Sequence, residues 1–204
     1  MRMPAAVSRL VRLATIAVCI AAPVLAQPSL TPQAANRFQD KLLEIAHFAA
    51  PAARAHTAHA IQVTDGEVNS YLRYKAASEI PVGIVDPMLN ADGNGRVSAQ
   101  AVVDLDAVRN AKPRTWSDPM GYLGGRVPLT AAGTLTTTNG VGHFQLESAT
   151  ISGVSIPKSV LQELLSYYSR TPENPQGIDM DDPFALPAGI REIRIGQGQA
   201  TIVQ

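Results

Sequence analysis

Two short turn motifs constrain the fold of this chain more than any other feature of its sequence. They are Asp92-Gly93-Asn94-Gly95 and, further along, Asn139-Gly140. Glycine and asparagine tolerate the positive φ angles of a tight hairpin turn, so each motif predicts two adjacent antiparallel strands. Apolar and polar residues alternate over 97–105 and 127–135, as expected for strands with one covered face. The chain is therefore predicted to form an antiparallel sheet of hairpins.

The sequence also predicts helices beside this sheet. Thr64 and Glu67 form the pattern of a capping box, which begins a helix bearing Val68, Tyr71 and Leu72 on one face. A second helix begins at Pro157, and its apolar stripe consists of Val160, Leu161, Leu164, Leu165 and Tyr168. Because hairpins outnumber strand–helix–strand units, the predicted class is α+β. We expect a curved antiparallel sheet of hairpins wrapped around or packed on two to three helices.

Small residues recur on the predicted covered face of the sheet. Ala99, Ala101, Ala131 and Gly133 leave space opposite them, which suits either tight helix packing or a wide interior. We expect the helix that begins at Pro157 to face this interior.

The first 26 residues are typical of a secretory signal peptide. Arg2, Arg9 and Arg12 precede an apolar run from Leu13 to Leu25, which is shorter than the roughly 20 residues that span a bilayer. We expect cleavage after Ala26, a periplasmic or secreted protein, and no transmembrane segment in the cleaved chain.

Two regions are predicted after the signal peptide. Residues 27–60 form an alanine-rich helical N-terminal segment, which begins at Thr31-Pro32 and carries Phe38, Leu42 and Ile45 on one face. Residues 61–204 form a single α+β domain, within which residues 110–125 are a loop that holds Trp116.

Composition excludes several classes of protein. Seventeen basic residues balance seventeen acidic ones, so the chain lacks the positive charge typical of nucleic-acid binding. The single cysteine, Cys19, lies in the predicted signal peptide, which excludes a disulfide scaffold. No cofactor-binding motif is found.

Two motifs resemble metal-binding sites, and neither has a complete set of ligands. The stretch Asn90–Ser98 has the oxygen spacing of an EF-hand loop, but Ala101 stands where the bidentate glutamate belongs. His56 and His59 have helical spacing but need a third ligand. We therefore predict a hairpin turn at the first motif, surface histidines at the second, and no metal site.

Four apolar stretches follow one another along the chain. They are Thr64-x-x-Glu67-Val-Asn69-x-Tyr71-Leu72, Gly95-x-Val97-x-Ala99, Ile156-Pro157-x-x-Val160-Leu161-x-x-Leu164-Leu165, and Leu186-Pro-x-Gly189-Ile190-x-x-Ile193-x-Ile195. In this order they resemble small periplasmic proteins of the tubular-lipid-binding-like and AsmA-like kind. The resemblance implies a curved sheet that wraps helices and holds acyl chains, with no catalytic residues. It also implies that Asn69 orients the start of its helix and that Leu161, Leu164 and Leu165 line a groove.

The expected function is therefore non-enzymatic binding of a lipid or other apolar small molecule in the bacterial cell envelope. The expected ligand-binding residues are Leu161, Leu164, Leu165, Tyr168, Leu72, Val68, Trp116 and Asn69. One alternative is a structural or inhibitor-like module that binds an envelope protein through an apolar patch around Trp116. A second alternative is a hydrolase that uses Asp179, Asp181 or His143, since paired carboxylates can perform acid–base chemistry.

Overall fold

The computed structural model describes residues 29–49, 59–110, 124–172 and 174–204. In these ranges it has four helices and nine strands, and every strand pairing is antiparallel. The helices are α1 (Pro32–Phe48), α2 (Asp65–Tyr74), α3 (Leu105–Asn110) and α4 (Lys158–Ser169). The strands are β1 (Ala60–Thr64), β2 (Ile84–Gly93), β3 (Arg96–Asp104), β4 (Arg126–Thr138), β5 (Val141–Ile151), β6 (Val154–Ser155), β7 (Phe184–Ala185), β8 (Glu192–Gly196) and β9 (Gln199–Val203). The predicted α+β class with an antiparallel sheet is confirmed.

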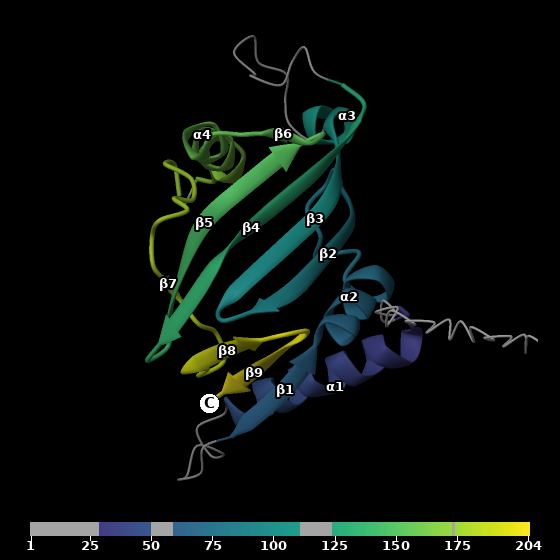
Figure 1. The fold of residues 1–204 in the computed structure, drawn as a ribbon, viewed down its shortest axis with the longest axis vertical. Helices are drawn as coiled ribbons and strands as arrows, with labels where there is room; N and C mark the ends of the chain where they lie inside the picture. Colours follow the sequence, from purple (N-terminus) through teal and green to yellow (C-terminus); the bar gives the residue numbers. More distant parts are fainter. Residues whose placement is uncertain (1–28, 50–58, 111–123, 173) are drawn as a thin grey trace, which may run out of the picture.

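The larger sheet has six strands, and both predicted hairpins are part of it. Strands follow the order β2-β3-β4-β5-β6, and β7 pairs with the start of β5 (Figure 1). The turn between β2 and β3 holds Asn94 at φ 53° and Gly95 at φ 80°, and the turn between β4 and β5 holds Asn139 and Gly140 at 52° and 81°. These left-handed conformations are the ones that make asparagine–glycine favourable in hairpins.

One strand ends earlier than the sequence predicts. Alternation suggested a strand to Leu105, but β3 ends at Asp104 and Leu105 is the buried first residue of α3. The Asp104 carboxylate accepts a hydrogen bond from the Ala107 amide at 2.9 Å, which is how an aspartate begins a helix. The expected 110–125 loop, including Trp116, lies outside the described residues over 111–123.

The main core lies under a second, three-stranded sheet of order β1-β9-β8. Ile45 of α1 packs with Ile61 and Val63 of β1 and with Ile190 to form a buried cluster. The boundary predicted at residue 60 therefore does not divide two cores, because the N-terminal helix covers the small sheet. The Gln204 side chain also crosses this boundary, because its amide donates a hydrogen bond to the Ile45 carbonyl of α1 at 3.0 Å.

Three helices contact the larger sheet. Helix α2 packs against β2, α3 contacts β3 and β4, and α4 lies beside β5 (Figure 1). On α4, Leu161, Leu164 and Leu165 are half-buried, and Val160 is 44% exposed. No helix in the described ranges is long and apolar enough to cross a membrane.

Candidate ligand groove between α2 and β2

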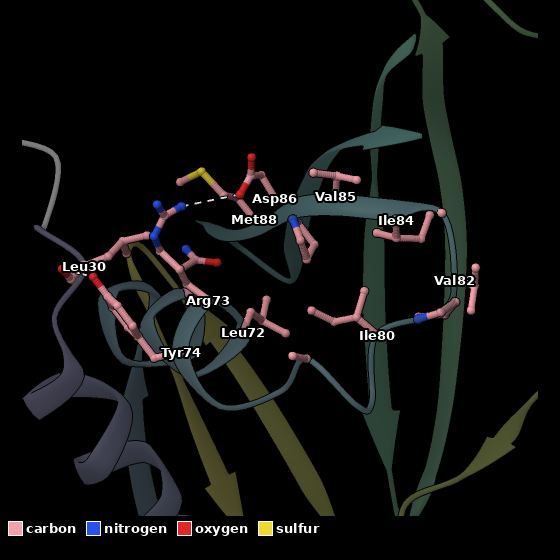
Figure 2. Close-up of a pocket in the computed structure, with 15 residues that line it drawn as sticks. Leu30, Leu72, Arg73, Tyr74, Ile80, Val82, Ile84, Val85, Asp86 and Met88 are labelled. Carbon is pink, nitrogen blue, oxygen red and sulfur yellow. Dashed lines mark hydrogen bonds and ion pairs between the residues drawn. The ribbon is translucent and has the colours of Figure 1, made fainter. Parts of the chain in front are cut away.

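A groove with a volume of about 720 Å³ lies between the C-terminal half of α2 and the first half of β2. Its apolar lining includes Leu72 from α2, Ile80 and Val82 from the connecting loop, and Ile84, Val85 and Met88 from β2. Figure 2 shows Leu72, Ile80 and Ile84 directed toward one another across the groove. Pockets that hold small molecules typically measure about 300–1,000 Å³, so the space is of ligand size.

The loop after α2 shapes the far end of the groove. At the end of α2 the Tyr71 carbonyl accepts hydrogen bonds from the amides of Lys75 and Ala76, and the buried Ala76 anchors the turn. The chain then returns through Gly83, whose φ is +89°. A Cβ at this glycine would lie 2.3 Å from Val108 Cγ2, so only glycine permits the close approach to α3. Val82, on the same loop, is left 66% exposed.

An irregularity in β2 forms the rim. The pairing of β2 with β3 shifts register between Val85 and Met88, and Asp86 within this bulge has φ 46°. Pro87 follows, so the strand lacks one amide donor on this stretch. The Asp86 carboxylate contacts the Arg73 guanidinium at 3.4 Å, and both side chains are more than half exposed. Such an exposed pair contributes little to stability and leaves both groups accessible to a ligand.

Beyond the rim, two side chains of α2 close the edge of β2. The Asn69 amide donates to the Leu89 carbonyl and accepts from the Leu89 amide, both at 2.7 Å. The Asp65 carboxylate accepts from the Ala91 amide at 3.1 Å. Asn69 is only 3% exposed, so it fixes the distance between helix and strand. Burial raises the pKa of Asp65, the Ala91 amide opposes this shift, and the nearby Asp92 charge adds to it.

The opposite side of α2 closes the edge of β1. The predicted capping box is present, since Glu67 accepts from the Thr64 amide at 3.0 Å while Thr64 accepts from the Glu67 amide. Lys41 of α1 donates to Glu67 Oε2 at 2.7 Å and to the Gln62 carbonyl at 2.6 Å. Although burial acts to raise the pKa of Glu67, hydrogen bonds from Lys41 and Thr64 lower it below its usual value. Helix α2 is therefore held by polar side chains on both sides.

The structure separates the predicted ligand-binding residues. Leu72 and Asn69 line the groove, with Asn69 occupied by the β2 backbone. Val68 packs against the core beneath the small sheet. Leu161, Leu164, Leu165 and Tyr168 all belong to α4, which lies beside β5 and does not line the groove. Trp116 lies outside the described residues.

Most of the groove lining was not predicted from the sequence. Pro81 and Gly83 indicated the end of a unit, and Asp86-Pro87 has the composition of a turn rather than a strand. The apolar run from Ile80 to Val85 was the one available signal.

A second, smaller hollow of about 200 Å³ lies on the larger sheet. It is lined by small and polar residues: Asn90, Ser98, Ala99, Gln100, Thr130, Ala131, Ala132 and Ser148. It is too small for a typical ligand and offers little apolar surface.

The residues of the alternative functions lie on separate elements. Asp179 and Asp181 belong to the loop after α4, where Asp181 pairs with Lys158 and its amide donates to Asp179. His143 is an exposed residue of β5. His59 stacks on Phe48 at 4.5 Å and lies 3.0 Å from Glu44, whereas His56 is outside the described ranges. Across the described residues, no cluster of three or more His, Cys, Asp or Glu side chains is placed to hold a metal ion.

Comparison with known proteins gives no family assignment. No family model, curated protein or solved structure matches the chain.

Proposed function

We propose that this protein binds a lipid or other apolar small molecule in the groove between α2 and β2, without chemical turnover. The single observation that carries the proposal is an apolar lining left uncovered: Val82 is 66% exposed and Tyr74 46% exposed at a groove of about 720 Å³. Exposed apolar surface is unfavourable in water, and apolar side chains that line a concave space of this size are typical of ligand-binding sites.

The polar groups at the groove suit an amphipathic ligand. Arg73 and Asp86 are the charged residues among the described lining, and they lie together at one rim. A ligand chain would contact Leu72, Ile80 and Ile84, while its polar end would remain beside the Arg73–Asp86 pair. The site thereby combines apolar contact with a small number of orienting polar groups.

The proposal includes export of the protein to the bacterial cell envelope. The N-terminal segment typical of a signal peptide and the resemblance to periplasmic lipid-binding proteins both support a place in the bacterial cell envelope. An apolar carrier there would keep its ligand out of water between membranes.

Fluorescence titration tests the proposal. The chain from residue 27 is titrated with a fluorescent polyene fatty acid, and saturable binding is expected. Val82→Asp places a charge in the apolar lining and should raise the Kd about tenfold, equivalent to about 1.4 kcal/mol. Because Val82 is exposed, this variant should fold normally.

Val154→Asp is the matched control, since Val154 is 70% exposed and lies on β6, outside the groove lining. Its Kd should equal that of the unmodified chain. An equal Kd for Val82→Asp and Val154→Asp would contradict the assignment of the groove.

A further inference from the structure

The chain enters the described structure at the wall of the groove. Leu30, directly before the N-cap residue Thr31 of α1, lines the groove together with Tyr74, and the Tyr74 hydroxyl donates to the Leu30 carbonyl at 3.4 Å. Figure 2 shows Leu30 beside Tyr74 at the side of the groove nearest α1. The residues that precede Leu30 are therefore covalently attached at the groove itself.

Those preceding residues have the chemistry of the groove lining. No charged residue occurs between Arg12 and Arg37, and the run from Leu13 to Leu25 is apolar. Among the described lining residues the two charges, Arg73 and Asp86, pair with each other, so an apolar segment can occupy the groove without separating them.

The attachment also places the apolar run within reach. Leu25 and Leu30 are five positions apart. An extended chain covers about 3.3–3.6 Å per residue, so Leu25 can lie up to roughly 17 Å from Leu30. A tether of this length gives an effective concentration on the order of millimolar, which favours even a weak apolar contact.

We infer that, while the N-terminal apolar run remains attached, its last residues around Val24 and Leu25 occupy the groove between α2 and β2. Cleavage after Ala26 removes this occupant and opens the groove to its ligand. Exclusion of the ligand by this segment rests on the proposed function. Occupancy of the groove by the residues around Val24 and Leu25 does not depend on it.

Disulfide trapping tests the occupancy without any ligand. In the full 204-residue chain, Cys19→Ser removes the single cysteine, and Leu25→Cys is combined with Val82→Cys. Mild oxidation should give an intramolecular disulfide, measured by mass spectrometry, at a rate at least about tenfold above that of the control pair Leu25→Cys and Val154→Cys. Equal rates for the two pairs would overturn the inference.

Ligand exclusion is tested with the fluorescent fatty acid on the uncleaved chain and on the chain from residue 27. The uncleaved chain should show a Kd at least about tenfold higher, and Leu25→Glu in the uncleaved chain should restore tight binding. Trapping without fatty-acid binding by either chain would refute the proposed function and leave the occupancy intact. Binding by the shorter chain with no selective trapping would refute the occupancy and leave the proposed function intact.

Discussion

Single polar side chains on α2 determine how two strand edges are closed. Asn69 and Asp65 satisfy the backbone of β2, while Glu67, with Lys41, satisfies the edge of β1. An open strand edge invites pairing with other chains, so these contacts protect the fold as well as position the groove.

Asp65 provides a prediction with a defined pH dependence. Its raised pKa means that the ionised carboxyl is less favourable in the folded chain than in the unfolded chain. Stability is therefore lost as pH rises from the ordinary value of 3.8 through the raised folded pKa, and the loss is complete above it. Asp65→Asn keeps an oxygen for the Ala91 amide and removes this loss.

Urea unfolding at about pH 3 and about pH 7 measures the effect. Relative to the unmodified chain, Asp65→Asn should gain stability on going from acid to neutral pH, by well under about 1 kcal/mol because solvent screens this partly exposed carboxyl. A variant that instead loses relative stability toward neutral pH would show that the Asp65 charge stabilises the fold.

Local sequence patterns predicted some of these contacts and not others. The capping box of Thr64 and Glu67 is readable because its partners are three residues apart. The resemblance suggested that Asn69 orients its helix, but its partner Leu89 is distant in sequence and is defined only by packing. Lys41 belongs to a helix that the sequence assigned to another segment.

At the scale of elements, α4 depends on the loop that follows it. Gln162 of α4 donates to the Ile178 carbonyl and accepts from the Met180 amide, and Ser169 accepts from the Ile178 amide. Gly177 lies against this helix with φ 78°, and a Cβ there would lie 2.0 Å from the Ser166 carbonyl oxygen. The loop can cover α4 in this way only because residue 177 is glycine.

Two glycines provide a matched comparison. Gly153 has nearly the same φ, 79°, but a Cβ there would meet nothing within 4 Å. Gly153→Ala should therefore cost only about 1–2 kcal/mol of conformational strain. Gly177→Ala adds a backbone clash and should cost clearly more in thermal unfolding. Equal losses for the two variants would show that the loop does not pack against α4 as described.

The sequence predicted the hairpins well but missed α3 and the role of β2. Turn chemistry and alternation located β3, β4 and β5, since both signals are local. Asp104 both ends a strand and begins α3, and alternation alone cannot distinguish these roles. The turn at 92–95 implied a strand before it, but the bulge at Asp86-Pro87 interrupts the pattern of β2 and concealed its role as the groove wall.

At the scale of the whole molecule, a buried threonine joins the two sheets. Thr137 of β4 donates to the Ile193 carbonyl at 3.0 Å and accepts from the Ile193 amide at 2.7 Å, and it is 8% exposed. The outer edge of β8 is thereby linked to the larger sheet. Replacing Thr137 with a nonpolar residue leaves both backbone groups of Ile193 without this partner.

Thr137→Val should therefore destabilise the protein by about 1–3 kcal/mol. Thr136→Val, at the neighbouring exposed position on the other face of β4, should change stability by less than about 0.5 kcal/mol. Chemical denaturation of both variants measures the difference. Similar values would mean that the sheets are held together without Thr137.

The sequence could predict the α+β fold class of this molecule but not the position of the groove between α2 and β2. The apolar stripe of α4 and the small residues of the sheet predicted a ligand site beside α4. The groove instead depends on the loop over 75–83 and on a bulged strand, both defined by tertiary packing rather than by periodicity.

Photoaffinity mapping tests directly whether the ligand binds between α2 and β2. A fatty acid carrying a diazirine is bound to the chain from residue 27, activated by light, and the labelled peptides are identified by mass spectrometry. The label should fall on residues 72–88, and competing unlabelled fatty acid should prevent the labelling. Competed labelling on α4, at Leu161, Leu164 or Leu165, with none on residues 72–88, would contradict ligand binding in the groove between α2 and β2.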